Sequence, residues 1–127
     1  MRDIEHQLQV ACVRWFNCQY PLLRGCLVAT PNGGRRDLVT GARLKAEGAL
    51  AGVADLNFYY RGRTLFIEMK TPSGRQSPAQ KQWQRTMETQ GFRYVICRSI
   101  DDFTRAINGF IAEQNDIHRT DKPILET

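Results

Sequence analysis

The sequence predicts a mixed α/β domain in which helices flank a small sheet, in the order α-β-α-β-β-α-β-α. Three patterns carry this prediction. Residues 52–70 read as two strands joined by a tight turn at Arg61 and Gly62. A strand–helix–strand succession follows over 65–97, and amphipathic helical repeats precede and follow these segments. Together they indicate one layered domain with its hairpin in the middle.

The other helices and strands are predicted from the spacing of apolar residues and from capping residues. Ser77 and Pro78 suit the N-cap and the first helical position, and Gly48 and Gly91 suit helix stops. Apolar residues at a spacing of three and four define the helices, and short β-prone apolar runs define the strands. The predicted helices cover 3–19, 37–47, 78–90 and a segment from 100, and the outer strands cover 26–30 and 92–97.

The length of 127 residues suits one domain, expected over 1–114. Residues 115–127 are polar without periodicity and predict a mobile tail. No apolar run is long enough for a membrane helix or a signal peptide, so no membrane association and a cytoplasmic location are expected, the host cytoplasm if a phage encodes the chain. The four cysteines lack metal-binding spacing, which favours reduced, buried thiols.

The formal charge of +5 favours a polyanionic partner. Arginine greatly outnumbers lysine among the basic residues, and guanidinium binds phosphate through two parallel hydrogen bonds. This composition favours nucleic acid. A solvated basic surface with no such partner explains the charge equally well, so charge leaves both interpretations open.

The hairpin at 52–70 predicts a metal site. A two-residue loop pairs Tyr60 with Arg63, and the same register places Asp55 directly across from Glu68. Lys70 lies on the face of Glu68. Facing side chains have Cβ atoms roughly 5 Å apart, and two carboxylates that close repel each other unless a cation lies between them. The hairpin therefore predicts a divalent cation with an ammonium group beside it.

Several other polar residues have an ordinary structural interpretation, a functional one, or both. Glu5 fits a first-turn carboxylate favoured by the helix dipole, and also a third acidic group carried to the metal. Gln80 fits plain solvent exposure in the first turn of its helix. Arg75 lies in the loop after Lys70, close to the expected site. A glycine turn followed by two arginines fits either a phosphate-binding loop or an ordinary solvated turn; its residues are Asn32, Gly33, Gly34, Arg35 and Arg36.

Several motifs resemble the VRR-NUC nucleases, a branch of the PD-(D/E)xK superfamily. They are Gly52-x-x-Asp55, Phe66-Ile67-Glu68-Met69-Lys70-Thr71-Pro72, and Gly74-Arg75-x-Ser77-x-x-Gln80-x-x-Trp83. The resemblance extends to Glu5 and to Asn32-Gly33-Gly34, and covers nearly the whole chain except the tail. Ala54 departs from the proline that many relatives have before the aspartate.

The resemblance implies a PD-(D/E)xK nuclease-like fold, with a mixed sheet flanked by helices, and a Mg²⁺- or Mn²⁺-dependent nuclease. It implies that Asp55 and Glu68 bind the ion together with the backbone carbonyl of Met69, and that Lys70 orients or helps deprotonate the attacking water. Glu5 becomes a metal-site or water-network carboxylate, and Gln80 a site residue beside the lysine. Candidate DNA-binding residues are Arg35, Arg36, Arg75, Asn32, Gly33 and Gly34.

The expected substrate is DNA. Small stand-alone family members, typical of phages, resemble homodimeric Holliday-junction resolvases, so we expect a homodimer that cleaves branched DNA. The chain carries no evident further DNA-binding domain, which fits recognition through dimerisation. A less selective or flap-type nuclease is the alternative enzyme. A non-catalytic DNA-binding module is the alternative from another class, and a metal titration separates it from an enzyme.

Overall fold

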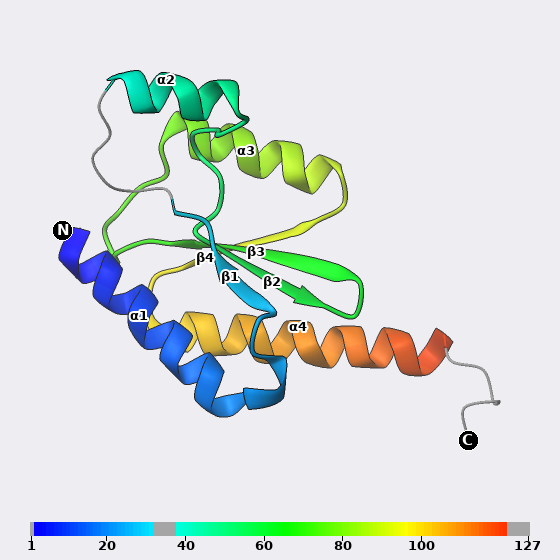
Figure 1. Ribbon diagram of the computed structural model, residues 1–127. Coiled ribbons are helices and arrows are strands. Elements are labelled where there is room, and N and C mark those ends of the chain that lie inside the picture. Colours follow the sequence, from blue (N-terminus) through cyan, green and yellow to red (C-terminus); the bar gives the residue numbers. More distant parts are fainter. Residues whose placement is uncertain (1, 32–37, 122–127) are drawn as a thin grey trace.

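A computed structural model of the chain describes residues 2–31 and 38–121 (Figure 1). The element order confirms the predicted succession, with one short 3-10 turn added after the first helix. Four strands form a mixed sheet flanked by helices, which confirms the predicted fold class. The elements are α1 (Arg2–Gln19), η1 (Pro21–Leu23), β1 (Leu27–Ala29), α2 (Leu38–Ala46), β2 (Leu56–Tyr60), β3 (Arg63–Met69), α3 (Pro78–Thr89), β4 (Arg93–Cys97) and α4 (Ile100–Asp121).

The sheet has the strand order β1-β2-β3-β4. The first three strands are antiparallel neighbours, and β4 lies parallel to β3 because α3 crosses over between them. Tyr60 pairs with Arg63 and Leu56 with Ile67, as the loop length predicts. Arg61 and Gly62 both have positive φ, 50° and 78°, the backbone of a type I′ turn. This turn fixes which residues of β2 and β3 face each other.

The two faces of the sheet bury different sets of residues. Figure 1 shows α1 and α4 on one face and α2 and α3 on the other. The main core lies between the sheet and the pair α1 and α4. It is built from Cys12, Phe16, Leu56, Phe58, Leu65, Ile67, Met69, Cys97, Phe103, Ile107 and Phe110. Because strand residues alternate, Asp55 and Glu68 belong to the opposite face, on the side of α3.

An aromatic cluster fastens α3 to that second face. The ring of Phe66 on β3 lies 4.9 Å from the ring of Trp83 in α3, in an edge-to-face arrangement. Phe92, which precedes β4, also packs against Phe66, with ring centroids 5.3 Å apart. Such contacts favour a defined angle between rings. Phe66 is two residues before Glu68, so this cluster sets how α3 lies beside the candidate site.

Gly52 lets the segment before β2 approach the first turn of α3. A Cβ atom at this position would lie 2.5 Å from the carbonyl carbon and oxygen of Ala79, and φ is +91°. Only glycine has no Cβ and adopts this backbone without strain. The contact joins the chain leading into Asp55 to the helix start that follows Lys70.

Gly52→Ala is expected to lower the free energy of unfolding by at least about 3 kcal/mol, because it adds a backbone clash to an unfavourable φ. Gly62→Ala is the matched control. Its φ is also positive, at +78°, but a Cβ atom there would meet no atom beyond its chain neighbours within 4 Å. The control is expected to lose only about 1–2 kcal/mol. Urea unfolding measures both, and equal losses would contradict a tight contact at Gly52.

Helix α4 is longer than the sequence predicts. Residues 115–121 belong to α4, where a mobile tail was expected over 115–127; residues 122–127 lie outside the described part of the chain. The Asn115 side chain accepts a hydrogen bond from the Tyr60 hydroxyl at 2.7 Å, and His118 Nε2 lies 3.0 Å from the Arg61 carbonyl oxygen. The prediction failed because Gln114, a polar residue, occupies a buried position of the helix stripe and hides its continuation.

The cysteine side chains agree with reduced thiols. All four are free, and Cys12 and Cys97 are fully buried in the core, whereas Cys26 is half-buried and Cys18 is exposed, so the prediction of buried thiols is wrong for Cys18. Burial raises the pKa of Cys12 to about 11 and that of Cys97 to about 12. These thiols therefore stay protonated at neutral pH and act as small apolar core residues.

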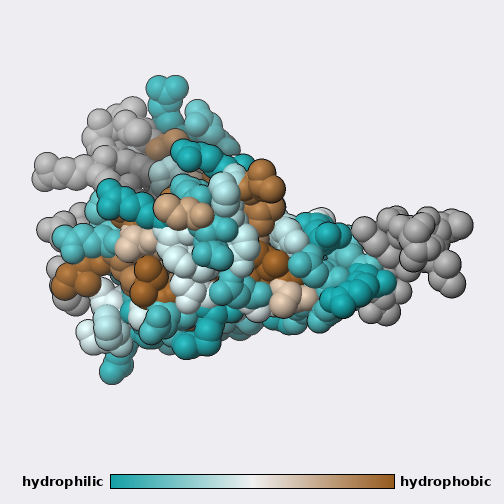
Figure 2. Space-filling model, turned by 90° about the horizontal axis from the view of Figure 1, so that it is seen from below, coloured by the Kyte–Doolittle hydropathy of each residue, from teal (hydrophilic) through white to brown (hydrophobic). Residues whose placement is uncertain are grey.

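The face carried by α1 and α4 is mainly polar. Figure 2 shows this face, where apolar groups form several separate patches between hydrophilic ones. Among the residues whose burial is described, Leu22 in η1 is the most exposed large apolar one, at 97%. Over the ranges 2–31 and 38–121, none of the helices is both long and apolar enough to cross a bilayer.

Candidate active site

Asp55 lies where β2 and β3 separate. The register would place Ala54 opposite Met69, but the Met69 N–H instead donates to Asp55 Oδ2 at 2.7 Å. The Asp55 carbonyl accepts from the Thr30 N–H at 2.9 Å, beyond the end of β1. The N–H and C=O of a strand residue point to the same side, so the Met69 carbonyl also faces the side of Asp55. Asp55 is thus held at the end of the sheet by two backbone contacts.

Glu68 is the most deeply buried charged residue that the structure describes, with 1% of its surface exposed. Its Oε1 atom accepts from Gln76 Nε2 at 3.0 Å and from the Tyr94 hydroxyl. Burial, and secondly the hydrogen bond to Glu68, raise the pKa of Tyr94 far above its ordinary value, so the hydroxyl keeps its proton and donates. Glu68 Oε2 is buried and has no hydrogen-bond partner.

Lys70 lies beside the unbonded oxygen. Its Nζ is 3.6 Å from Glu68 Oε2, close enough for an ion pair and too far for a hydrogen bond, and its side chain is 12% exposed. The loop after it is fixed by Arg98, whose Nη1 donates to the carbonyls of Thr71 at 2.8 Å and Gly74 at 2.6 Å. The backbone after Lys70 is therefore held in place, and the Lys70 ammonium lies beside the Glu68 carboxylate.

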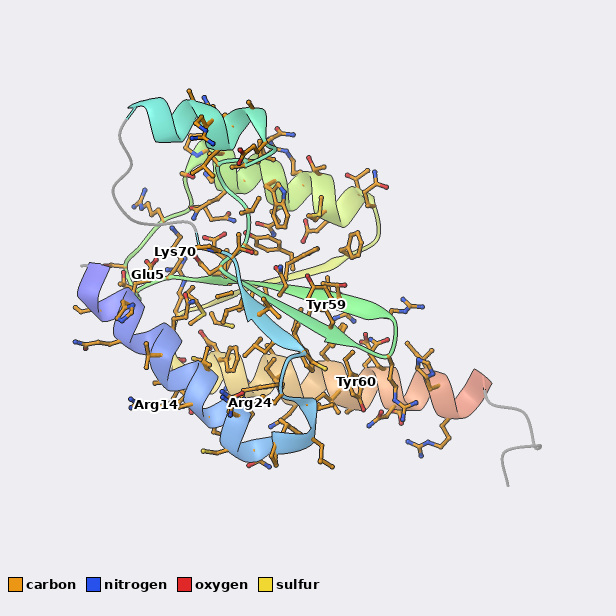
Figure 3. All side chains as sticks on the ribbon, in the orientation of Figure 1. Glu5, Arg14, Arg24, Tyr59, Tyr60 and Lys70 are labelled. Carbon is orange, nitrogen blue, oxygen red and sulfur yellow. The ribbon has the colours of Figure 1, made fainter. Side chains whose placement is uncertain are left out.

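Glu5 approaches the same place from α1. Figure 3 shows Glu5 and Lys70 near each other, where the start of α1 meets the end of β3. Burial raises the pKa of Glu5, and the Asp55 carboxylate raises it further; Lys70 opposes this shift and Glu68 adds to it. The three acidic residues and the lysine thus share one electrostatic environment.

The donor set fits a hard divalent cation. Mg²⁺ and Mn²⁺ prefer oxygen ligands, and Mg²⁺ usually binds through one or two carboxylates and keeps several waters. Glu68 Oε2 is buried and accepts no hydrogen bond, and the Lys70 ammonium at 3.6 Å satisfies it only in part, so this oxygen is available to a further cation. Within 2–31 and 38–121, however, no three His, Cys, Asp or Glu side chains converge closely enough to form a metal site by themselves. Water and backbone carbonyl oxygens would therefore have to complete the ligands of a cation at this place.

Comparison with known proteins identifies the family. The model of the VRR-NUC domain family matches residues 3–101. The chain belongs to the VRR-NUC family. This confirms the resemblance seen in the sequence and assigns a nuclease-type domain to most of the chain. The match includes Glu5, Asp55, Glu68, Lys70 and Gln80.

A solved structure agrees with this assignment at the level of the fold. A VRR_NUC domain protein superposes with a TM-score of 0.72 and 24% sequence identity, over 85% of this chain and 88% of that chain. No curated protein sequence matches the chain. The mixed sheet with its flanking helices is therefore the fold of a VRR-NUC domain protein.

Gln80 lies in the first turn of α3, and its side chain helps to cap the start of this helix. The side-chain oxygen Oε1 of Gln80 accepts from the Ser77 backbone N–H at 2.8 Å. The backbone N–H of Gln80 donates to Ser77 Oγ at 3.1 Å, which completes a capping box. The cap uses the oxygen, which is the atom that could accept from Lys70. A contact between the Gln80 amide nitrogen and a phosphate oxygen stays a prediction.

The predicted DNA-binding residues cannot all be placed. Arg75 is exposed in the loop between β3 and α3, near Lys70 in the chain. The glycine turn and the two arginines after it, residues 32–36, lie outside the described part of the VRR-NUC domain. Their role in binding DNA stays a prediction.

Two residues at the site were missed by the sequence reasoning, Gln76 and Tyr94. Both contact Glu68 directly. Tyr94 could have been found from the parallel pairing of β3 and β4, which aligns it with Phe66 on the face of Glu68. Gln76 lies in an irregular loop, and no periodic pattern indicates where its side chain points.

A cavity of about 200 Å³ lies at the opposite end of the VRR-NUC sheet. It is lined by the β2–β3 turn, by the segment before β4 and by α4, including Gly62, Phe92 and Gln114. Asp55, Glu68 and Lys70 do not line it. The candidate active site is therefore defined by charge and burial at the sheet end, and the cavity does not contribute to it.

Proposed function

We propose that the protein is a Mg²⁺- or Mn²⁺-dependent DNA endonuclease that hydrolyses phosphodiester bonds. The observation that carries the proposal is the buried, unbonded Oε2 of Glu68, which lies 3.6 Å from Lys70 Nζ in a VRR-NUC domain. A buried carboxylate oxygen without a donor is unfavourable in a purely structural role. It is suitable as one ligand of a cation.

Each residue has a role that follows from its chemistry. Asp55 and Glu68 would hold the ion together with the Met69 carbonyl, and the ion supplies charge stabilisation for the transition state and an activated water. Lys70 orients the attacking water and offsets negative charge on the phosphate. Glu5 orders water next to the site, and Gln80 and Arg75 contact the phosphate backbone.

We further propose that the substrate is branched DNA, such as a Holliday junction, and that the protein acts as a homodimer. Two active sites related by a two-fold axis match the paired cuts that a four-way junction requires. The support is the resemblance of small VRR-NUC chains to junction resolvases. A less selective or flap-type nuclease would share the same active site and differ only in its substrate.

The test is a Mg²⁺-dependent cleavage panel of single-stranded, duplex, flap and four-way DNA, combined with light scattering. We expect a dimer that cuts the four-way junction in preference to linear duplex, and we expect no cleavage with EDTA. A monomer with equal activity on all substrates would contradict the junction and dimer assignments. DNA binding that is equal with Mg²⁺ and EDTA, without cleavage under either condition, would contradict the enzyme assignment.

A further inference from the structure

The two oxygens of Glu68 have unequal surroundings. Oε1 receives both hydrogen bonds, one from Gln76 and one from Tyr94, whereas Oε2 receives none and faces Lys70. Two donors use the two lone pairs of one carboxylate oxygen. The two oxygens of a carboxylate are equivalent, so a rotation by half a turn changes nothing, but any smaller rotation would weaken both bonds. The two donors therefore fix the plane of the carboxylate, and with it the position of the unbonded oxygen.

The Gln76 amide is itself oriented by α3. Gln76 Nε2 donates to Gln84 Oε1 at 2.7 Å as well as to Glu68, and Gln84 Nε2 donates to Glu88 Oε2 at 3.2 Å. A carboxylate only accepts, so Glu88 turns the Gln84 nitrogen toward itself and the Gln84 oxygen toward Gln76. The Gln76 nitrogen then faces two acceptors. A flipped amide at either glutamine would bring oxygen against oxygen, so this network has one consistent direction.

Tyr94 is held by independent contacts. β4 pairs with β3 so that Tyr94 aligns with Phe66, two residues before Glu68. The Tyr94 ring lies 6.1 Å from the Trp83 ring in the aromatic cluster. Its position is therefore fixed by packing, and its hydroxyl donates to Glu68. Removal of the hydroxyl should leave the packing intact.

We infer that Tyr94 and Gln76 are positioning residues that hold Glu68 Oε1 and thereby present Oε2 to the cation. Gln84 and Glu88 extend this positioning network to the exposed side of α3. The inference rests on the proposed function, because it assigns the partners that orient one proposed metal ligand. The network acts through Glu68.

The test compares Tyr94→Phe and Gln76→Met with two matched controls. Tyr59→Phe removes a hydroxyl from an exposed tyrosine of β2, away from Lys70 in Figure 3. Gln82→Met changes an exposed glutamine of α3 whose hydrogen bonds go to Arg85 and Thr86. Mn²⁺ binding is measured by calorimetry without DNA, and the Mg²⁺ concentration for half-maximal cleavage is measured separately.

Tyr94→Phe and Gln76→Met are each expected to weaken Mn²⁺ binding by about 10- to 100-fold and to raise the half-maximal Mg²⁺ concentration similarly. The cleavage rate at saturating Mg²⁺ should fall much less, because the ligand itself remains. The controls should match the unmodified protein. Gln84→Met, which does not touch Glu68, should show a smaller effect in the same direction.

Unchanged Mn²⁺ affinity in both Tyr94→Phe and Gln76→Met would overturn the inference, while Mg²⁺-dependent cleavage by the unmodified protein would leave the proposed function standing. The absence of Mn²⁺ binding and cleavage in the unmodified protein would instead contradict the proposed function itself. Thermal unfolding checks each variant. A loss of activity that follows unfolding, with unchanged Mn²⁺ affinity of the folded protein, would also overturn the positioning role.

Discussion

Glu68→Gln is expected to remove most of the cleavage activity while the protein remains folded. Glutamine keeps the shape of the side chain and an acceptor for Tyr94 and Gln76, but it removes the charge that would bind the cation. We expect cleavage to fall on the order of 10³-fold, since a bound ion contributes several kcal/mol to such reactions. Mn²⁺ binding measured by calorimetry should fall below detection.

The free energy of unfolding of metal-free Glu68→Gln should fall by up to about 3 kcal/mol, because the largely buried Lys70 ammonium loses its partner. Glu113→Gln is the control, since it changes a glutamate whose partner is Arg93, at the end of the sheet near the cavity. The control should cleave normally. A stable Glu68→Gln variant with normal cleavage would show that this carboxylate has no part in the reaction.

Lys70→Met is expected to lower cleavage by about 10²- to 10⁴-fold while Mn²⁺ binding is retained or tightened. The ammonium lies 3.6 Å from Glu68 Oε2 and competes with a cation for that oxygen. Its removal therefore favours the ion but takes away the group that orients water and offsets charge on the phosphate. Gel-based cleavage at saturating Mg²⁺ and calorimetry with Mn²⁺ measure the two effects separately.

The opposite effects on Mn²⁺ binding distinguish the two residues. Glu68→Gln should lose the ion and Lys70→Met should keep it, although both lose cleavage. Lys81→Met, at an exposed lysine of α3, serves as the control for a lost surface charge. A Lys70→Met variant that loses Mn²⁺ binding together with its fold would indicate a structural ion pair in place of the proposed catalytic role.

The sequence was sufficient for the parts of the site that depend on a short hairpin. A two-residue loop determines the register, and the register brings Asp55, Glu68 and Lys70 together. The contribution of Glu5 came from the family resemblance, because local rules favoured an ordinary first-turn carboxylate. The structure places it in the same electrostatic environment as the other three residues.

The features that the sequence did not reveal depend on contacts between distant segments. Gln76 reaches Glu68 from an irregular loop, and Tyr94 reaches it through the parallel pairing of β3 and β4. The Ser-x-x-Gln spacing predicts that Gln80 caps α3, whereas the family resemblance placed Gln80 beside Lys70. In α4, a buried Gln114 interrupts the apolar stripe and hid the last turns of the helix.

The most direct test is a crystal structure of the protein with Mn²⁺, in which the ion is located by its anomalous scattering. We expect a peak roughly 2.0–2.2 Å from Glu68 Oε2 and from a carboxylate oxygen of Asp55, with Tyr94 and Gln76 still bonded to Glu68 Oε1. Crystals grown in millimolar Mn²⁺ that show no peak at this position, or a peak that Glu68 does not contact, would contradict the proposed metal site.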